Sequence, residues 1–218
     1  MSQFKQVSST QDLVICLDFA DPHSYLALTG SLALVKDLNL SVQWLPLSAG
    51  LSRLSSRQPM ALQQDPLAEY KARRAQARQK NTEAELRRTS RLLDIPLANC
   101  RLPFDAAIAA IGLLFVNGVQ ADASGYIEAV FETVFRRGIT SNMLVTKILS
   151  GLDVDLEDWQ HFVQGPGPEA LQQLEDELLS LGVFSSPGYI HRGECYHGRQ
   201  HLPLLRWYLS GAKGAAPV

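Results

Sequence analysis

The sequence predicts an α/β protein in which a long helical segment interrupts a small unit of strands and helices. Three stretches of the 218 residues carry this prediction. An apolar run leads directly into a helical pattern at 12–29. Residues 66–160 are almost free of strand signals, and strand-like runs return at 183–197 before a closing helix. The predicted order is therefore β-α-β, helical insertion, α-β-β-α.

The first strand and helix meet at a short polar break. Residues 13–17 are apolar, β-rich and too few for a buried helix, so they predict a central strand. Asp21 suits the N-cap of a helix and Pro22 suits its first position. The free N–H groups of this helix should then lie at the carboxyl edge of a sheet. That geometry binds anions and stabilises thiolates.

The second strand is predicted at 40–47, where apolar and polar residues alternate. A strand, a helix and a strand at this spacing indicate a right-handed βαβ unit with parallel strands. Residues 48–59 are rich in Ser and Gly and are typical of a loop.

The middle of the chain predicts helices only. A highly charged helix at 67–93 should end before Pro96, because the residue before proline resists the helical region. Shorter helices follow at 103–115, with a break at Asn117-Gly118, and then at 123–137, 141–149 and 155–163. This segment is too long for a structureless loop. We therefore predict a helical insertion domain at 61–164 within a domain made of 1–60 and 165–218.

The last part returns to the mixed pattern. A helix at 168–181 should end at Gly182, which suits the position after a helix C-terminus. Two short apolar segments flank Arg192-Gly193-Glu194, which indicates a hairpin. A closing helix is predicted at 198–209.

Composition narrows the class of protein. The 46% hydrophobic content supports a real core, and the net charge of −2 argues against a general binder of nucleic acids or anionic membranes. No apolar run is long enough to span a bilayer, and no secretory signal pattern opens the chain. The three cysteines lie far apart, with no Cys-x-x-Cys and no zinc spacing. We expect a soluble, cytoplasmic protein without metal, disulfide framework, membrane or nucleic-acid partner.

The first turn carries a resemblance to a known family. Asp21-Pro22-His23-Ser24 occupies the place where thioredoxin-like oxidoreductases of the DsbA type carry Cys-Pro-His-Cys. The wider run at 17–27 is similar to the kappa-class glutathione transferases and the 2-hydroxychromene-2-carboxylate isomerases, whose segment reads Phe-Asp-Phe-x-Ser-Pro-Tyr-Ser-Tyr/Trp-Leu-Ala. The resemblance implies a thioredoxin-like fold with a large all-helical insertion.

The resemblance also implies a function. It points to a homodimeric enzyme that acts on a small aromatic or carboxylated substrate, with glutathione as a possible cofactor. The alternative is a non-catalytic thioredoxin-fold binding protein that has lost redox and glutathione chemistry. Thiol–disulfide exchange at this turn is excluded, because neither position 21 nor position 24 is a cysteine.

Catalytic roles at the turn fall, by the same resemblance, to Asp21, His23 and Ser24. The family uses the Ser before Pro to activate the sulfur of glutathione, and this chain has Asp21 there. Asp21 can instead be an N-cap that stabilises the helix by about 1 kcal/mol without any catalytic role. His23 is a candidate base or donor, whereas Ser24 suits packing or hydrogen bonding.

A second part of the predicted site lies near the C-terminus. By the resemblance Pro187 is a cis-proline, and Ser186 offers its backbone to the cysteinyl part of glutathione. Arg199 and Gln200 fall in the run Gly198–His201, where the family holds the γ-glutamyl group. The alternative is that Pro187 only shapes an edge strand and that Arg199 and Gln200 are surface residues.

The charged helix at 67–93 has two interpretations. Residues 69–93 hold eight Lys and Arg against three Glu, which is typical of a solvated helix face and only weakly of a nucleic-acid stripe. If this helix borders the cleft, Tyr70, Arg73 and Arg74 would attract an anionic substrate.

Overall fold

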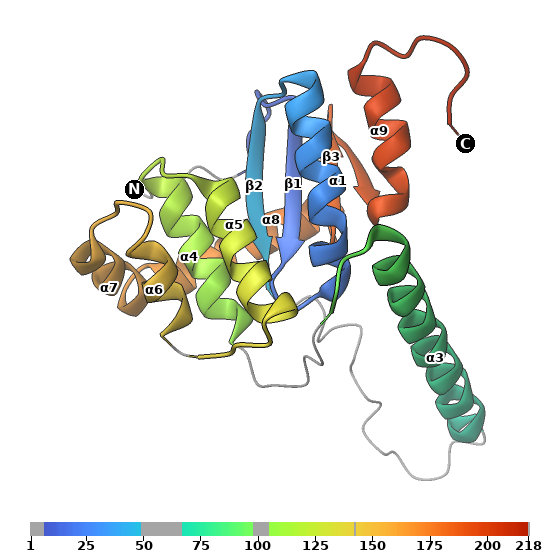
Figure 1. Ribbon diagram of the computed structural model, residues 1–218, viewed down its shortest axis with the longest axis horizontal. Coiled ribbons are helices and arrows are strands. Elements are labelled where there is room, and N and C mark those ends of the chain that lie inside the picture. Colours follow the sequence, from blue (N-terminus) through green and yellow to red (C-terminus); the bar gives the residue numbers. More distant parts are fainter. Residues whose placement is uncertain (1–6, 49–66, 98–104, 142, 218) are drawn as a thin grey trace.

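The computed structural model describes residues 7–48, 67–97, 105–141 and 143–217 (Figure 1). Most of the loop predicted at 48–59 and the helix start predicted at 103–104 lie outside these residues. The described chain forms one mixed sheet with helices on both faces and a further group of helices at one side.

The sheet has the strand order β2-β1-β3-β4. β1 (Leu13–Asp18) is completely buried and pairs in parallel with β2 (Val42–Leu47). β3 (Gly188–His191) runs antiparallel to β1, and β4 (Glu194–His197) closes the hairpin. The predicted βαβ unit and hairpin are confirmed, although β2 begins two residues later than the alternation suggests.

Two helices of the mixed unit lie on opposite faces of this sheet. α1 (Pro22–Leu38) lies in front of it and α8 (Gly167–Ser180) behind it (Figure 1). A short 3₁₀ turn, η2 (Arg199–His201), leads into α9 (Leu202–Leu209), which packs beside α1. Gly182 has a φ of +91°, as its predicted position after α8 requires.

The helical group begins with α4 (Ala106–Gly118), which is apolar on all sides and is buried against β2 and α8. The helix ends at Gly118, within the break predicted at Asn117-Gly118. The side chain of Asn117 donates to the carbonyl oxygen of Trp44 at 2.8 Å, which anchors this end of α4 to β2.

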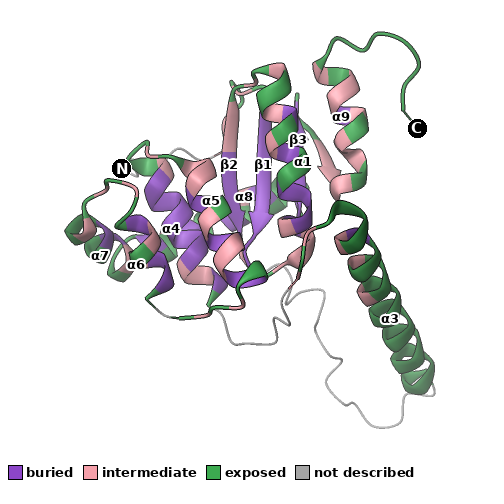
Figure 2. Cartoon of the chain, in the orientation of Figure 1, coloured by how far each residue is buried: buried purple, intermediate pink, exposed green. Residues whose placement is uncertain are grey.

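Two of the remaining helices of this group, those predicted at 123–137 and 141–149, are shorter than the pattern indicates, whereas the one predicted at 155–163 has its predicted length. The helix predicted at 123–137 is α5 (Ala123–Phe131) followed by a π-turn, η1 (Glu132–Arg136). α6 (Leu144–Leu149) starts three residues after its predicted beginning, and α7 (Leu156–Gln164) starts at an Asp155 cap. Buried side chains continue from the sheet into α4 and α5 (Figure 2). The domain boundaries at 60/61 and 164/165 stay a prediction.

The helix α3 (Ala68–Leu93) differs from all the others. It projects away from the sheet and is exposed along most of its length (Figures 1 and 2). Thr89, near its C-terminal end, is buried, and this end contacts α1. None of the described helices is both long and apolar enough to cross a membrane.

Candidate functional site

The site is built around Asp21, which joins β1 to α1. One carboxylate oxygen, Oδ1, accepts the backbone N–H of His23 at 2.9 Å and so caps α1, as predicted. The other oxygen, Oδ2, accepts the hydroxyl of Ser186 at 2.6 Å. Asp21 is therefore both a cap and a partner of a residue 165 positions away.

Ser186 and Pro187 lie directly against this turn. The Ser186–Pro187 peptide bond is cis, which confirms the prediction for this proline. The carbonyl oxygen of Pro187 accepts the N–H of Gly198 at 2.7 Å, so the loop before β3 is also held to the start of η2. The hydrogen bond from Ser186 to Asp21 joins the two predicted halves of the site.

The other two residues of the predicted catalytic group differ in exposure. His23 is half-buried on the first turn of α1, beside the Asp21 cap. Ser24 is completely buried, and its Oγ accepts the backbone N–H of Asp18 at 3.1 Å. Ser24 therefore fastens α1 to the end of β1 and does not face the space in front of the turn.

Asp18 is a site residue that the sequence reasoning missed. It ends β1 just before the turn, is 5% exposed, and accepts the N–H of Ala20 at 2.7 Å. Burial raises the pKa of its carboxyl to about 6, and the nearby charges of Asp21 and Glu175 act in the same direction. A single acidic residue at the end of an apolar strand was the available signal.

Arg199 and Gln200 both have partners within the protein. The guanidinium of Arg199 donates to the hydroxyl of Thr89 at 2.9 Å and so ties η2 to the base of α3. The side-chain amide of Gln200 donates to the carbonyl oxygen of His197 at 2.8 Å. Their predicted contact with a cofactor stays a prediction.

Tyr70, Arg73 and Arg74 lie apart from the Asp21 turn. They stand on the exposed N-terminal half of α3, and Arg73 pairs with Glu69 on the same helix. Because α3 contacts the body through its opposite end, the structure does not bring these three side chains together with Asp21 and Ser186 (Figure 1).

A groove of about 750 Å³ runs beside α1, within the size range of small-molecule sites. The α1 wall is formed by Tyr25, Leu28, Thr29 and Leu32, and the first of these lies one helical turn after Asp21. The opposite wall comes from α5 and the π-turn, and residues 94–96 line the groove after α3. The groove thus connects the mixed unit to the helical group next to the turn.

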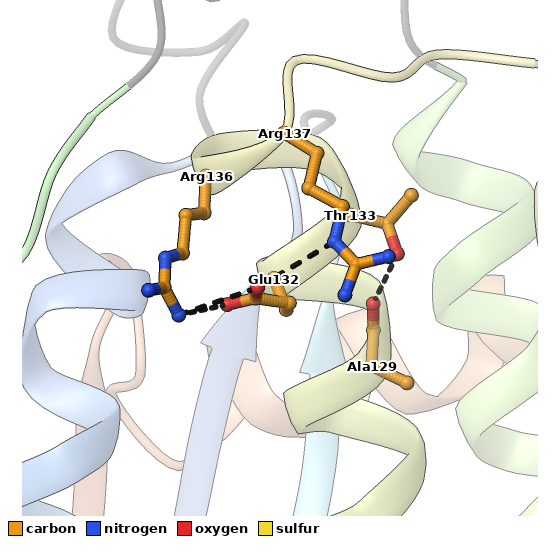
Figure 3. Close-up of polar contacts among 5 residues, drawn as sticks. All are labelled: Ala129, Glu132, Thr133, Arg136 and Arg137. Atoms are coloured by element: carbon orange, nitrogen blue, oxygen red, sulfur yellow. Dashed lines mark hydrogen bonds and ion pairs between the residues drawn. The ribbon is translucent and has the colours of Figure 1, made fainter.

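The π-turn supplies charged groups to this groove. Glu132 pairs with Arg136 at 3.2 Å and with Arg137 at 3.6 Å, and the two guanidiniums lie on either side of its carboxylate (Figure 3). Glu132 and Arg136 line the groove, and these residues too were missed. The pair of arginines at the end of an aromatic helix face was a weak signal for them.

A glutathione thiolate does not fit at this turn. Asp21 already accepts the first helical N–H and the hydroxyl of Ser186, so its carboxylate stands where a thiolate would need donors. Two adjacent negative charges would also repel each other. What the turn offers is a partly exposed carboxylate that can accept a proton. Asp21 does not itself line the groove, whose α1 wall begins one helical turn later, at Tyr25.

Comparison with known proteins identifies the fold. No protein-family model matches the chain, and no curated protein matches it. A solved 2-hydroxychromene-2-carboxylate isomerase superposes with a TM-score of 0.72 at 21% identity, covering 91% of this chain and 94% of that one. A probable DsbA oxidoreductase from Streptomyces coelicolor gives 0.64 at 16% identity, covering 95% and 92%. This chain therefore has the DsbA-like thioredoxin fold with its helical insertion, and is similar in structure to 2-hydroxychromene-2-carboxylate isomerase.

Proposed function

We propose that this protein is an enzyme of the 2-hydroxychromene-2-carboxylate isomerase type, acting on a small aromatic or carboxylated substrate. One observation carries the proposal: the Asp21 carboxylate, held by Ser186 beside a cis-proline, lies one helical turn from a groove of about 750 Å³. The similarity to an isomerase over most of both chains supports this class.

Asp21 and His23 are the groups we assign to proton transfer. The carboxylate accepts a proton from the bound substrate, and the imidazole, two residues further on the same turn, returns one. Ser186 orients the carboxylate through its hydroxyl. Ser24 acts indirectly, by holding α1 against the end of β1.

Turnover of 2-hydroxychromene-2-carboxylate, followed by absorbance, tests the proposal. We expect Asp21→Asn to lower kcat about 100-fold, which is typical of losing a general acid or base. Asn remains a good N-cap, so the fold should survive. Asp122→Asn, which alters the cap of α5 instead, is the matched control and should keep full activity. Folded wild-type protein that turns over neither this compound nor related aromatic carboxylates would contradict the proposal.

Glutathione dependence is tested separately. Since the residues do not fit a thiolate at the turn, we assign glutathione no step, and we expect turnover without it. A calorimetric titration with reduced glutathione at millimolar concentration checks this expectation. A dissociation constant below about 1 mM would show that glutathione binds and would contradict this expectation. The homodimer and the cytoplasmic location stay predictions.

A second function is favoured by one specific observation. Asp21, Ser186, Arg199 and Gln200 all bond within the protein, as expected of a binding module whose former chemistry is lost. Such a module would bind an aromatic carboxylate with measurable affinity and leave it unchanged. Binding without turnover across the substrates named above would therefore favour this function.

A further inference from the structure

A second groove lies at the end of the sheet opposite to the Asp21 turn. It has a volume of about 740 Å³ and spans that end of the sheet, from α8 on one face to the last turns of α1 and α9 on the other (Figure 1). The six residues of β1 separate it from Asp21 by about 20 Å. Its size is within the range of small-molecule sites, and the chemistry assigned to Asp21 does not use it.

Much of the wall of this second groove is apolar. Val14 and Ile190 line it from the sheet, and both are buried in the core. Leu38 and Leu40 line it at the end of α1, and Leu181 lines it just after α8. A ligand with an apolar body would therefore remove apolar surface from water when it binds here, which favours binding.

Glu177 brings an unsatisfied carboxylate to the same groove. It lies one turn before the C-terminal end of α8, and its Oε2 is completely buried. Among the described residues, nothing donates a hydrogen bond to this oxygen. Such an oxygen is unfavourable, because it has lost contact with water and gained no donor in exchange. A cation bound in the groove would offset that loss.

His191 gives the groove a hydrogen-bond acceptor in a fixed orientation. This residue is 8% exposed, and its Nδ1 lies 2.8 Å from the carbonyl oxygen of Asp12. Since a carbonyl oxygen can only accept, Nδ1 carries the hydrogen and Nε2 of the neutral ring has a lone pair. The ring of Tyr208 lies beside the imidazole, with centroids 6.5 Å apart, and the face of a tyrosine ring attracts cations.

The charge of the lining favours a ligand with one positive charge. Two carboxylates, of Asp12 and Glu177, line the groove against one guanidinium, of Arg192, so the lining has a net charge of −1 when His191 is neutral. The hydroxyl of Ser41, and then its backbone N–H, lower the pKa of Asp12, so this carboxylate stays ionised. Arg192 would repel a second ammonium group, so a monoamine fits better than a diamine.

We propose that this second groove binds a small primary amine with an apolar body, whose ammonium group is held between the Glu177 carboxylate and Nε2 of His191. An ammonium group has three N–H donors, so it can serve both acceptors at once. The apolar body then packs on the wall formed by Val14, Ile190 and Leu38. The inference goes beyond the proposed function, because the site is separate from Asp21 and binding requires no turnover.

Calorimetric titration with 2-phenylethylamine at pH 7, with the neutral 2-phenylethanol as comparison, tests the inference. Wild-type protein should bind the amine with a dissociation constant of about 1 mM or lower and prefer it to the alcohol at least tenfold. Glu177→Gln should weaken binding of the amine about tenfold and change binding of the alcohol less than twofold. Arg192→Gln should strengthen binding of the amine two- to threefold, because it removes a repelling charge. General damage to the fold would not produce this opposite sign.

A neighbouring acidic residue provides the matched control. Asp176 precedes Glu177 on α8, is exposed, and accepts the side-chain amide of Gln172, but it does not line the groove. Asp176→Asn should leave both affinities unchanged. Nuclear magnetic resonance locates the site independently, since the amine should shift the ring signals of His191 and leave those of His23 in place. Circular dichroism confirms that each variant is folded.

The outcomes separate this inference from the proposed function. No binding of the amine by wild-type protein at 10 mM, equal affinity for amine and alcohol, or an unchanged affinity in Glu177→Gln would each overturn the inference. Binding that is lost in Asp21→Asn and kept in Glu177→Gln would place the amine at the Asp21 turn and would also overturn it. Amine binding that depends on Glu177 supports the inference whether or not the protein turns over an aromatic carboxylate.

Discussion

Asp18 and Asp21 are only three residues apart, yet the fold uses their carboxyl groups differently. Asp21 is partly exposed and accepts two hydrogen bonds at the N-terminus of α1. Asp18 is buried behind it, and burial raises its pKa from the usual 3.8 to about 6. The folded state therefore holds a proton on Asp18 more tightly than the unfolded chain does.

Stability should consequently fall as pH rises through the titration of Asp18. A raised pKa for an acid contributes stability that is fully present below about pH 4 and is lost as the pH passes 6. Asp18→Asn cannot titrate and keeps an acceptor for Ala20. We expect it to remove this dependence and to stabilise the protein above pH 6 by ~2–3 kcal/mol. Urea unfolding between pH 4 and 8 measures the effect.

The same substitution at Asp122 is a control, because the pKa of Asp122 is shifted in the opposite direction to that of Asp18. The N–H of Gly125, and then the hydroxyl of Ser124, lower the pKa of Asp122, so its contribution is present at neutral pH and is lost on acidification. Asp122→Asn should therefore reduce stability at neutral pH and have little effect in acid. If the free energy of unfolding of Asp18→Asn depended on pH as steeply as that of the wild-type protein, Asp18 would not be the group whose titration destabilises the fold.

Among the elements, α3 should be the least protected helix. Its backbone hydrogen bonds lie open to solvent except near Thr89, whereas α4 is enclosed by β2 and α8. We expect amides at 68–85 to exchange hydrogen at least 100-fold faster than those of α4, measured by mass spectrometry. If the amides at 68–85 were strongly protected and lost this protection when the protein was diluted, α3 would not be a solvated helix, and the result would support the homodimer.

The helices were predictable where local chemistry decides them. The sequence Asp21-Pro22 marks the start of α1, and the buried run at 13–17 marks β1. The π-turn could not be predicted, because the apolar spacing of α5 continues into residues 134 and 135 without interruption. The direction of α3 was equally hidden, since it depends on contacts made only near its C-terminal end. That is why Tyr70, Arg73 and Arg74 were associated with the cleft.

At the scale of the whole molecule, the scaffold should accept the redox chemistry that its sequence lacks. The double variant Asp21→Cys plus Ser24→Cys places Cys-Pro-His-Cys at the start of α1, in a fold similar to a DsbA oxidoreductase. A helix N-terminus lowers the pKa of a thiol and favours exchange. We expect reduction of insulin disulfides by this variant in the presence of dithiothreitol.

The single variant Asp21→Cys is the control for that experiment. It keeps the native thiols, including the buried Cys16, but has no second cysteine in the turn. It should reduce insulin no faster than wild-type protein. Equal rates for the single and double variants would mean that the turn does not bring positions 21 and 24 into exchange geometry.

The candidate site was only partly predictable because the fold assembles it from distant segments. Asp21, Ser186 and the cis-proline were identified from the resemblance, and the structure joins them through one hydrogen bond. The groove could not be identified in the same way. It combines α1, α5 and residues 94–96, which lie far apart in the sequence, and α5 contacts α4, which in turn contacts β2. Long-range packing, rather than any local motif, places Arg136 beside Tyr25.

The projection of α3 also makes the molecule an electric dipole. This helix holds eight basic and three acidic side chains, a net charge of +5, whereas the whole chain has −2. The rest of the chain therefore carries −7. Near any charged surface the molecule should turn the tip of α3 toward negative charge and its body toward positive charge. At low ionic strength it should adhere to cation-exchange media above its isoelectric point of about 6.2, and salt should release it.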